Sequence, residues 1–359
     1  MFSKQLQDKI DIAKARMKPV QLGSIAFASP LILAPMSAIC NAPFRRLMED
    51  LGAGGTVSEL ISCHGINHGN VRTRNMLKLD PVEKNVGLQL FGEDAESMAL
   101  AAKVAQEHGP KFIDINMGCP VKKVVTKGGG SALLKDTSKL GHFFGTIKKE
   151  LEVPLTIKIR TGWDSDALNA DEVIHIAREE GVEFVAIHGR TRTQQYTGEA
   201  NWEYLEKIAE ISPLPVIGNG DLHTAGAAKE RMHKTQCAAL MLGRGPLRDP
   251  FIFLDSYLLA EDQVRFSASD YLEVIQKLFD YMKLYTDTEK TLVIQMRKHI
   301  MWFAAGFDGV THFRRGLFGH DNVDQTLKYT QDYFDDLKVR GLEYKRIDHT
   351  QAFMTSGHG

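Results

Sequence analysis

Short runs of apolar, often β-branched residues follow one another along residues 31–242. Each run ends at or near a glycine or a polar residue. The segments between them include stretches with helical periodicity, such as 95–108, where Ala95, Met98, Ala102 and Ala105 share one face. Strands that alternate with helices predict right-handed crossovers and a parallel sheet. The eight predicted strands are Leu31–Met36, Thr56–Leu60, Val86–Phe91, Phe112–Met117, Leu155–Ile159, Phe184–His188, Pro215–Gly218 and Ala238–Leu242.

Eight such units within roughly 210 residues favour an α/β fold of the (β/α)8 type, a TIM barrel, over an open doubly wound sheet. In this barrel, functional groups gather at the carboxyl ends of the strands. Polar residues lie in or just after nearly every run, so we expect them to meet at one mouth. They are Ser37, Ser58, Glu59, Gln89, Asn116, Cys119, Lys158, Arg160, His188, Arg190, Asn219, Asp221 and Arg244.

Beyond residue 250 the apolar positions recur only at helical spacing. The sequence therefore predicts a catalytic barrel over 1–250 and an all-helical C-terminal domain over 251–345, entered through Asp249-Pro250. Residues 346–359 are expected to form a flexible tail. The helical stripes are Leu272, Ile275, Phe279 and Met282; Leu292, Met296, Ile300 and Phe303; and Val323, Leu327, Phe334 and Leu337.

The composition of the 359 residues, 43% apolar and 25% charged, is that of an ordinary globular protein. A net charge of −1 gives no global positive field, so nucleic-acid binding would need a local patch. The charged N-terminus does not resemble a signal peptide, and no apolar run is long enough to span a membrane. The four cysteines are widely spaced, which argues against structural zinc, other bound metal or disulfides, and indicates reduced thiols in the cytoplasm.

Cys119 stands out because it follows the fourth predicted strand directly, after Gly118 and before Pro120. Two lysines, Lys122 and Lys123, come next in the chain. A thiol at a strand end beside Asn116 and near cations suggests a chemical role, although a single intracellular cysteine is more often inert packing.

The seventh and eighth predicted strands end in Gly218-Asn219-Gly220-Asp221 and Gly243-Arg244-Gly245. Loops at these two strands commonly bind phosphate in this fold, with backbone N–H groups and a nearby arginine as donors. The alternative is two ordinary glycine turns. Neither a Rossmann fingerprint nor a P-loop occurs in the sequence, and a barrel with a phosphate cradle could hold flavin mononucleotide (FMN).

Lys158, at the end of the fifth strand, has three interpretations. It could stabilise an anionic reduced flavin, with Gln89 bonding to the ring edge. It could instead form a Schiff base, as in barrel aldolases. A third role is a plain ion pair. The residues alone do not separate these alternatives.

The motifs together resemble the tRNA-dihydrouridine synthase family, most of all its bacterial B-type subgroup. The most specific match is 114–124, DINMGCPVKKV. Supporting matches lie at 34–36, 87–92, 158–163, 188–192, 218–221, 243–244 and 296–299. The resemblance implies reduction of uridine to 5,6-dihydrouridine in tRNA, with FMN as cofactor and NADPH as electron donor.

The resemblance also implies roles for individual residues. Cys119 matches the family's catalytic acid, which protonates C5 of uracil while reduced FMN gives hydride to C6. Ser37, Gly218 and Asn41 depart mildly from the usual family residues. The implied FMN contacts are Pro35, Met36, Ser37, Gln89, Lys158, His188, Asn219, Gly220, Asp221, Gly243 and Arg244.

An ordinary thiol is mostly protonated near neutral pH and can act as that acid. Lys122 and Lys123 would favour the thiolate unless they face the RNA phosphates instead. Asn116 is the expected partner of the uracil carbonyl or imide edge.

We expect the helical domain to contact the RNA around a splayed uridine, with Arg297, Lys298 and His299, and with Arg314 and Arg315, as the candidate phosphate contacts. Arg72 and Arg74 in the barrel are weaker candidates, and all of these could be solvated surface. The protein is expected to be a monomer. Alternative functions are a flavin barrel that reduces a free pyrimidine, a Schiff-base aldolase, and a tRNA-binding protein without catalysis.

Overall fold

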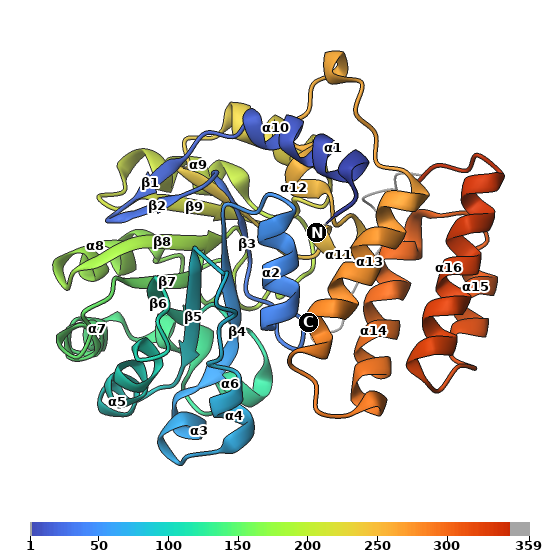
Figure 1. Cartoon of the computed structure of the whole chain (residues 1–359). Helices are drawn as coiled ribbons and strands as arrows, with labels where there is room; N and C mark the ends of the chain where they lie inside the picture. Colours follow the sequence, from blue (N-terminus) through green and yellow to red (C-terminus); the bar gives the residue numbers. More distant parts are fainter. Residues whose placement is uncertain (1, 345–359) are drawn as a thin grey trace.

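The computed structural model describes residues 2–344, and its centre is a closed barrel of eight parallel strands (Figure 1). Around the barrel the strands follow the order β10-β3-β4-β5-β6-β7-β8-β9, so each strand lies beside its neighbour in sequence. The predicted TIM barrel is therefore confirmed. Its strands are β3 (Leu31–Leu33), β4 (Gly55–Ser62), β5 (Val86–Phe91), β6 (Phe112–Met117), β7 (Leu155–Arg160), β8 (Val182–His188), β9 (Val216–Asn219) and β10 (Ala239–Leu242).

Helices cover the outside of the barrel. In α5 (Ala95–Gln106) the predicted stripe of Ala95, Met98, Ala102 and Ala105 is buried, and Asp94 caps the first turn by accepting from Ser97 N–H at 2.8 Å. The other elements between the strands are α2 (Ala42–Asp50), α3 (Cys63–Asn67), α4 (Val71–Asn75), α6 (Lys122–Val125), η1 (Gly130–Lys135), η2 (Thr137–Lys139), α7 (Leu140–Lys149), α8 (Ala170–Glu179), α9 (Trp202–Ile211) and α10 (Ala225–Lys234).

Two N-terminal elements were not predicted from the sequence. Helix α1 (Lys4–Ala15) lies against the C-terminal part, where Lys9 pairs with Asp270 at 2.6 Å. The hairpin β1 (Val20–Leu22) and β2 (Ile25–Phe27) places Phe27 edge-to-face against Phe112 and Phe184, with ring centroids 6.0 and 5.9 Å apart. Three-residue strands carry too short a pattern to be recognised in the sequence.

The barrel interior is apolar at its amino end and polar at its carboxyl end. Phe112 fills the lower layer so tightly that a Cβ at Gly87 would lie 2.1 Å from its ring. Alternation along β6 then points Asp114 and Asn116 inward above Phe112. The polar end of the interior therefore opens toward the loops that follow the strands.

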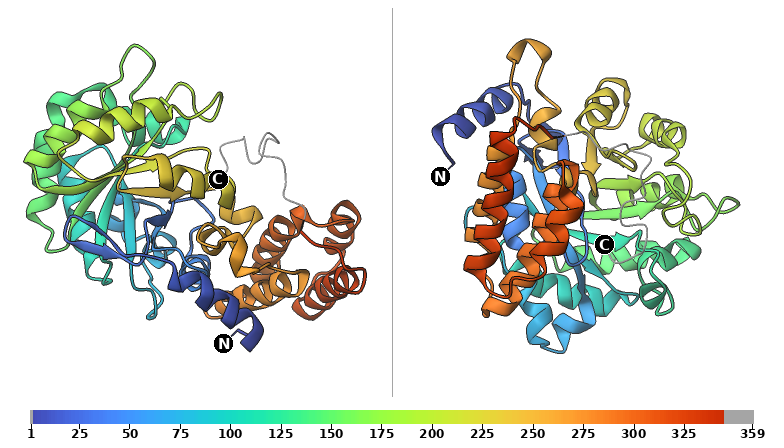
Figure 2. Two further views of the ribbon diagram at one scale, coloured as in Figure 1. Left: turned by 90° about the horizontal axis from the view of Figure 1, so that it is seen from above. Right: turned by 90° about the vertical axis from the view of Figure 1, so that its right-hand side faces the viewer.

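The chain beyond the barrel is helical in the described part that follows β10, residues 243–344 (Figure 2). The predicted stripes of Ile275, Phe279 and Met282 and of Met296 and Ile300 are buried. Leu272, Val323 and Leu327 are only half-buried. The helices are α11 (Gly245–Arg248), α12 (Ile252–Asp255), η3 (Ala260–Asp262), α13 (Ala268–Lys283), α14 (Glu289–Phe303), η4 (Ala304–Gly306), α15 (Val310–Leu317) and α16 (Val323–Val339).

A continuous apolar core joins the C-terminal helices to α1, α2 and α10–α12 on one side of the barrel. The division into domains at 250 and 251 stays a prediction, because this core crosses it. Residue 345 and the predicted tail at 346–359 lie outside the described residues.

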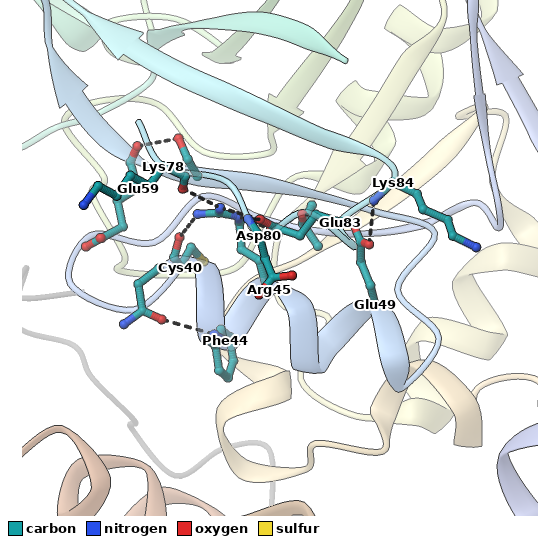
Figure 3. Close-up of polar contacts among 12 residues, drawn as sticks. Cys40, Phe44, Arg45, Glu49, Glu59, Lys78, Asp80, Glu83 and Lys84 are labelled. Atoms are coloured by element: carbon teal, nitrogen blue, oxygen red, sulfur yellow. Dashed lines mark hydrogen bonds and ion pairs between the residues drawn. The ribbon is translucent and has the colours of Figure 1, made fainter. Parts of the chain in front are cut away.

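A buried ion pair fixes α2 to the segment before β5 (Figure 3). Arg45 donates to both carboxylate oxygens of Glu83, at 2.7 and 2.9 Å, and to the carbonyl of Cys40 at 2.9 Å. The Arg45 and Glu83 side chains are 2% and 0% exposed. Tyr285, just after α13, donates to Asp80, whose own N–H donates to Glu83, so this network also anchors the C-terminal helices.

Candidate active site

A cavity of about 170 Å³ opens at the carboxyl end of the barrel. Every predicted FMN contact lines it, and so do Asn116 and Cys119, whereas Arg297 and Lys298 do not. Residues that are distant in sequence meet here because all eight strands end at this mouth. The lining consists of Ala34, Pro35, Met36, Ser37, Ile39, Leu60, Gln89, Asn116, Gly118, Cys119, Pro120, Val121, Lys158, Arg160, His188, Tyr196, Asn219, Gly220, Asp221, Leu222, His223, Met241, Gly243 and Arg244.

Cys119 lies on a tight turn that begins where β6 ends. The side-chain oxygen of Asn116 accepts from the N–H groups of Gly118 and Cys119, at 3.3 and 2.9 Å. The carbonyl of Cys119 accepts from both the N–H and the hydroxyl of Ser131, at 3.1 and 2.9 Å. The turn is therefore held from both sides, which fixes the direction of the thiol.

Gly130, the last residue of the glycine triplet 128–130, packs against this turn. Gly130 has φ +59°, and a Cβ there would lie 2.9 Å from the carbonyl oxygen of Cys119. A side chain at this position would meet both backbone strain and a clash. Gly130 thus allows the close packing of the cysteine turn.

The thiol of Cys119 is partly buried, and its environment favours the protonated form. Burial raises the pKa of Cys119, and the charges of Arg160 and Lys158 oppose that shift without reversing it. Lys122 and Lys123 are exposed on α6, and their charges are not among those that act on the thiol. Cys119 therefore carries its proton at neutral pH. The other three cysteines are buried.

Lys158 points across the cavity from β7 toward β9. Its ammonium donates to the side-chain oxygen of Asn219 at 3.1 Å, and the Asn219 amide nitrogen donates to the Met241 carbonyl at 2.7 Å. Burial, followed by the nearby Arg160, lowers the pKa of Lys158 to about 8. Near neutral pH the amine is still mostly charged, but it gives up its proton more readily than a surface lysine.

His188, at the end of β8, is a neutral ring. Burial lowers its pKa well below the usual value, and the charges of Arg160, Lys158 and Arg190 lower it further. The cavity wall thus combines cations with an uncharged imidazole.

Both carboxylate oxygens of Asp221 accept hydrogen bonds from other parts of the protein. Burial alone would raise its pKa, but the nearby His223 ring and hydrogen bonds from Arg190 and the backbone bring that pKa well below its usual range. The two Arg190 contacts are 2.8 and 2.9 Å long, and the N–H of Ala200 donates to the same carboxylate at 2.7 Å. A ligand would therefore meet the backbone of 220–223 rather than a free carboxylate.

Beside Gly243, which follows β10, the protein leaves enough space for a Cβ atom. A Cβ there would meet Ala34 at 3.8 Å and Met36 at 4.0 Å, and nothing closer. The protein's own packing therefore does not require glycine, although the position lines the cavity. This is the arrangement expected where a bound group approaches the backbone, and it fits a phosphate ester between β9 and β10.

Several cavity residues were given no role from the sequence, among them Arg160, which was expected only to lie at the barrel mouth, and Tyr196. Arg160 donates from Nε to the Gly118 carbonyl at 2.8 Å, and from Nη1 to the carbonyls of Thr191 and Gln195, both at 2.8 Å. Its position at a strand end was the available signal. Tyr196 lies 5.6 Å from the Arg160 guanidinium and 5.4 Å from that of Arg244. It comes from a loop without any periodic pattern, so no signal could have found it.

The two predicted substrate contacts from the C-terminal helices have protein partners. Lys298 donates to the carbonyl of Ala38 at 2.9 Å, next to the cavity residue Ser37, and Arg297 pairs with Asp321 at 3.2 Å. Arg314 donates to the Met301 carbonyl at 3.1 Å, whereas Arg315 is exposed.

Two other kinds of site do not occur in the described part of the chain. Among residues 2–344, no group of three or more His, Cys, Asp or Glu side chains is arranged to hold a metal ion. Within the same stretch, none of the helices is long and apolar enough to cross a membrane.

Comparison with known proteins gives a consistent result. The family model for dihydrouridine synthase matches residues 32–338. A tRNA-dihydrouridine synthase B of Pseudomonas syringae pv. tomato is 37% identical over 324 residues, covering 89% of this chain and 95% of the relative. A probable tRNA-dihydrouridine synthase of Rickettsia conorii is 35% identical over 302 residues, covering 82% and 90%.

Solved structures share the fold at low identity. Histamine dehydrogenase from a Rhizobium species matches with a TM-score of 0.54 and 10% identity, over 75% of this chain and 51% of that one. This chain thus spans about half of that larger protein, and the likeness concerns the barrel fold alone.

Proposed function

Since this chain belongs to the dihydrouridine synthase family, we propose that it reduces uridine in tRNA to 5,6-dihydrouridine with a flavin cofactor. The observation that carries the proposal is the thiol of Cys119, held on a fixed turn in a cavity whose other side fits a phosphate ester. The resemblance to the B-type subgroup agrees with the names of the relatives, among them tRNA-dihydrouridine synthase B enzymes.

The cofactor that fits is FMN. The backbone after β9 and β10, with Gly220, Gly243 and Arg244, would hold its phosphate. Lys158, Gln89 and His188 would face its ring system. When bound and reduced, by NADPH in this proposal, the flavin supplies the hydride that C6 of uracil receives.

The protein's own part in the reaction is to position the base and to move one proton. The C5=C6 bond of uracil is conjugated with the C4 carbonyl, so addition at C6 moves negative charge onto that oxygen. Cys119 then gives its proton from Sγ to C5. Asn116 can assist only as a donor, because its oxygen already accepts two backbone N–H groups. It therefore suits a uracil carbonyl and not the imide N–H.

The test of this function uses the purified protein, NADPH and a tRNA transcript that contains no dihydrouridine. We expect a gain of two hydrogen atoms at specific uridines, detected by mass spectrometry of nuclease fragments. A flavin-free preparation that leaves the transcript unchanged after added FMN would contradict it. The monomeric state and the cytoplasmic location stay predictions.

Gly243→Val should remove flavin while leaving the fold intact. The Cβ of the valine would lie no closer than 3.8 Å to Ala34, but the side chain would occupy space beside the proposed phosphate. We expect flavin content to fall at least about tenfold, which corresponds to ~1.4 kcal/mol of lost binding. Circular dichroism should remain unchanged. Normal flavin content in this variant would place the phosphate elsewhere. Measuring the flavin content of Lys158→Met in the same way tests whether Lys158 contacts the flavin.

Lys122 and Lys123 are proposed to contact RNA phosphates, since they are exposed beside the cavity and do not act on the thiol. Replacing both with glutamine should weaken tRNA binding and lower the salt dependence of log K by about one for each lysine–phosphate pair removed. Titrations at several salt concentrations measure this slope. An unaltered slope would exclude these lysines, and Lys148→Gln with Lys149→Gln, on α7, provides the matched control.

A further inference from the structure

A row of buried polar side chains crosses the barrel interior beneath the cavity. Thr156, Asp114, Gln89 and Asn116 come from three adjacent strands, and each is at most 8% exposed. The register explains their contact, because Gln89 pairs with Asp114 across β5 and β6, and Asp114 pairs with Thr156 across β6 and β7. The row ends at the turn that carries Cys119.

Every hydrogen bond in this row is donated toward Asp114. The N–H groups of Gly118 and Cys119 donate to Asn116 Oδ1, and Asn116 Nδ2 donates to Gln89 Oε1 at 2.8 Å. Gln89 Nε2 donates to Asp114 Oδ2 at 2.7 Å. Thr156 Oγ1 donates to Asp114 Oδ1, also at 2.7 Å.

The Gln89 and Asn116 amides do not by themselves determine which of their ends donates and which accepts. Either amide can turn over and exchange its donor and acceptor ends. Backbone N–H groups, in contrast, can only donate, and an ionised carboxylate can only accept. Asp114 is therefore the fixed acceptor at one end, opposite the fixed donors of the cysteine turn at the other.

We propose that Asp114 is a positioning residue: by accepting from Gln89 it fixes the orientation of the Gln89 and Asn116 amides, and through them the turn that presents Cys119. It touches neither the cavity nor the thiol, since it does not line the one and its contacts are with Gln89 and Thr156. Besides this row of bonds, its charge acts on Lys158.

The row of bonds also determines which polar groups Gln89 and Asn116 present to the cavity. With both oxygens occupied inside the row, Gln89 and Asn116 each retain one N–H that no bond of the row uses, and both residues line the cavity. They therefore present donors, which suit carbonyl groups of a bound ring. Asp114 thus also sets the hydrogen-bonding character of this wall. Burial raises the pKa of Asp114 to about 6, which leaves it mostly ionised and accepting at neutral pH.

The proposal deepens the function above, in that it names Cys119 as the group being positioned. Its test, however, does not depend on tRNA. The rate at which iodoacetamide alkylates Cys119 in the full-length protein reports the exposure and pKa of this thiol, because the other three cysteines are buried. Mass spectrometry identifies the labelled site, and the rate is followed against pH.

Asp114→Ala should change the alkylation rate by about tenfold, or displace its pH profile by about one pH unit. This is the size of effect expected when a buried donor loses its acceptor. Asp114→Asn should stay within about threefold of the parent, because its amide oxygen can still accept from Gln89 once the Thr156 hydroxyl turns. An unchanged profile in Asp114→Ala would overturn the proposal.

A pair of variants tests the direction of the bonds and remains informative if Asp114→Ala does not fold. In the parent protein, Gln89 Nε2 and Asp114 Oδ2 lie 2.7 Å apart. Gln89→Glu would place a second carboxylate at this distance from Asp114, so it should disturb Cys119 as strongly as Asp114→Ala does. In the double variant Gln89→Glu with Asp114→Asn, the carboxylate that accepts the hydrogen bonds stands at position 89 and no longer at position 114. The new carboxylate at position 89 then accepts from the amides at both 114 and 116.

The double variant should therefore return the alkylation profile to within about threefold of the parent, although the single variant does not. If the double variant is no better than Gln89→Glu alone, the row does not orient the turn. Dihydrouridine formation can fail in all of these proteins without affecting this result. A failure of the proposed function is thereby distinguished from a failure of the positioning role.

Discussion

Replacing Cys119 with alanine is expected to lower the rate of dihydrouridine formation by about 10²–10⁴-fold, the usual contribution of a positioned general acid. The charge that builds up on the uracil C4 oxygen can collapse only when C5 receives a proton. In the variant, that proton has to come from water at the cavity mouth. Flavin content should be unchanged, because none of the proposed flavin contacts is altered. Single-turnover mixing of reduced enzyme with tRNA measures the step directly.

Two controls sharpen this prediction. Cys237→Ala removes a thiol that does not line the cavity, so turnover should stay close to that of the parent. The pH profile gives the sign of the effect. A thiol acid works only when protonated, and the pKa of Cys119 is raised by burial. The rate governed by this thiol should therefore stay level through neutral pH and decline only in the alkaline range. A decline that begins below about pH 7, where an ordinary thiol is still protonated, would contradict the acid role.

The second large effect is on stability. Arg45→Met should lower the free energy of unfolding by about 3–5 kcal/mol, because it leaves the Glu83 carboxylate buried and unpaired. Denaturant titration measures this loss as a shift of the unfolding midpoint. The same variant frees the Cys40 carbonyl, which follows the cavity segment 34–37, so some loss of flavin is also expected.

Restoring charge balance should reverse most of that loss. In Arg45→Met with Glu83→Leu, no unpaired charge remains from this ion pair, and apolar replacements of buried ion pairs are often neutral. Lys103→Met provides the matched control, since its pair with Glu150 is 57% and 42% exposed and should contribute little to stability. Equal losses in Arg45→Met and Lys103→Met would show that burial does not matter here.

Much of the fold could be predicted from the chain, because burial leaves a local record. The eight runs became eight strands, and β5 and β6 have the predicted ends. The hairpin β1–β2 and helix α1 were missed. Their role depends on distant partners such as Phe112 and Asp270, which no local pattern records.

The candidate site divides in the same way. Residues at strand ends, from Gln89 to Arg244, could be placed at one mouth because parallel strands bring their ends together. Tyr196 could not be found, because it comes from a loop without periodicity. The assignments of Arg297 and Lys298 to RNA stay predictions, and each of these residues has a partner within the protein.

The sequence by itself determined that a thiol would follow the fourth barrel strand, since strand order and the break at Gly118 are properties of neighbouring residues. The tertiary structure decided the state of that thiol. The charges that act on Cys119 come from Arg160 and Lys158 on the next strand, while the adjacent Lys122 and Lys123 face solvent. The turn is held by a row of bonds that ends at Asp114. Hydrophobic pattern records which residues are buried, but only the register between strands fixes which buried groups meet.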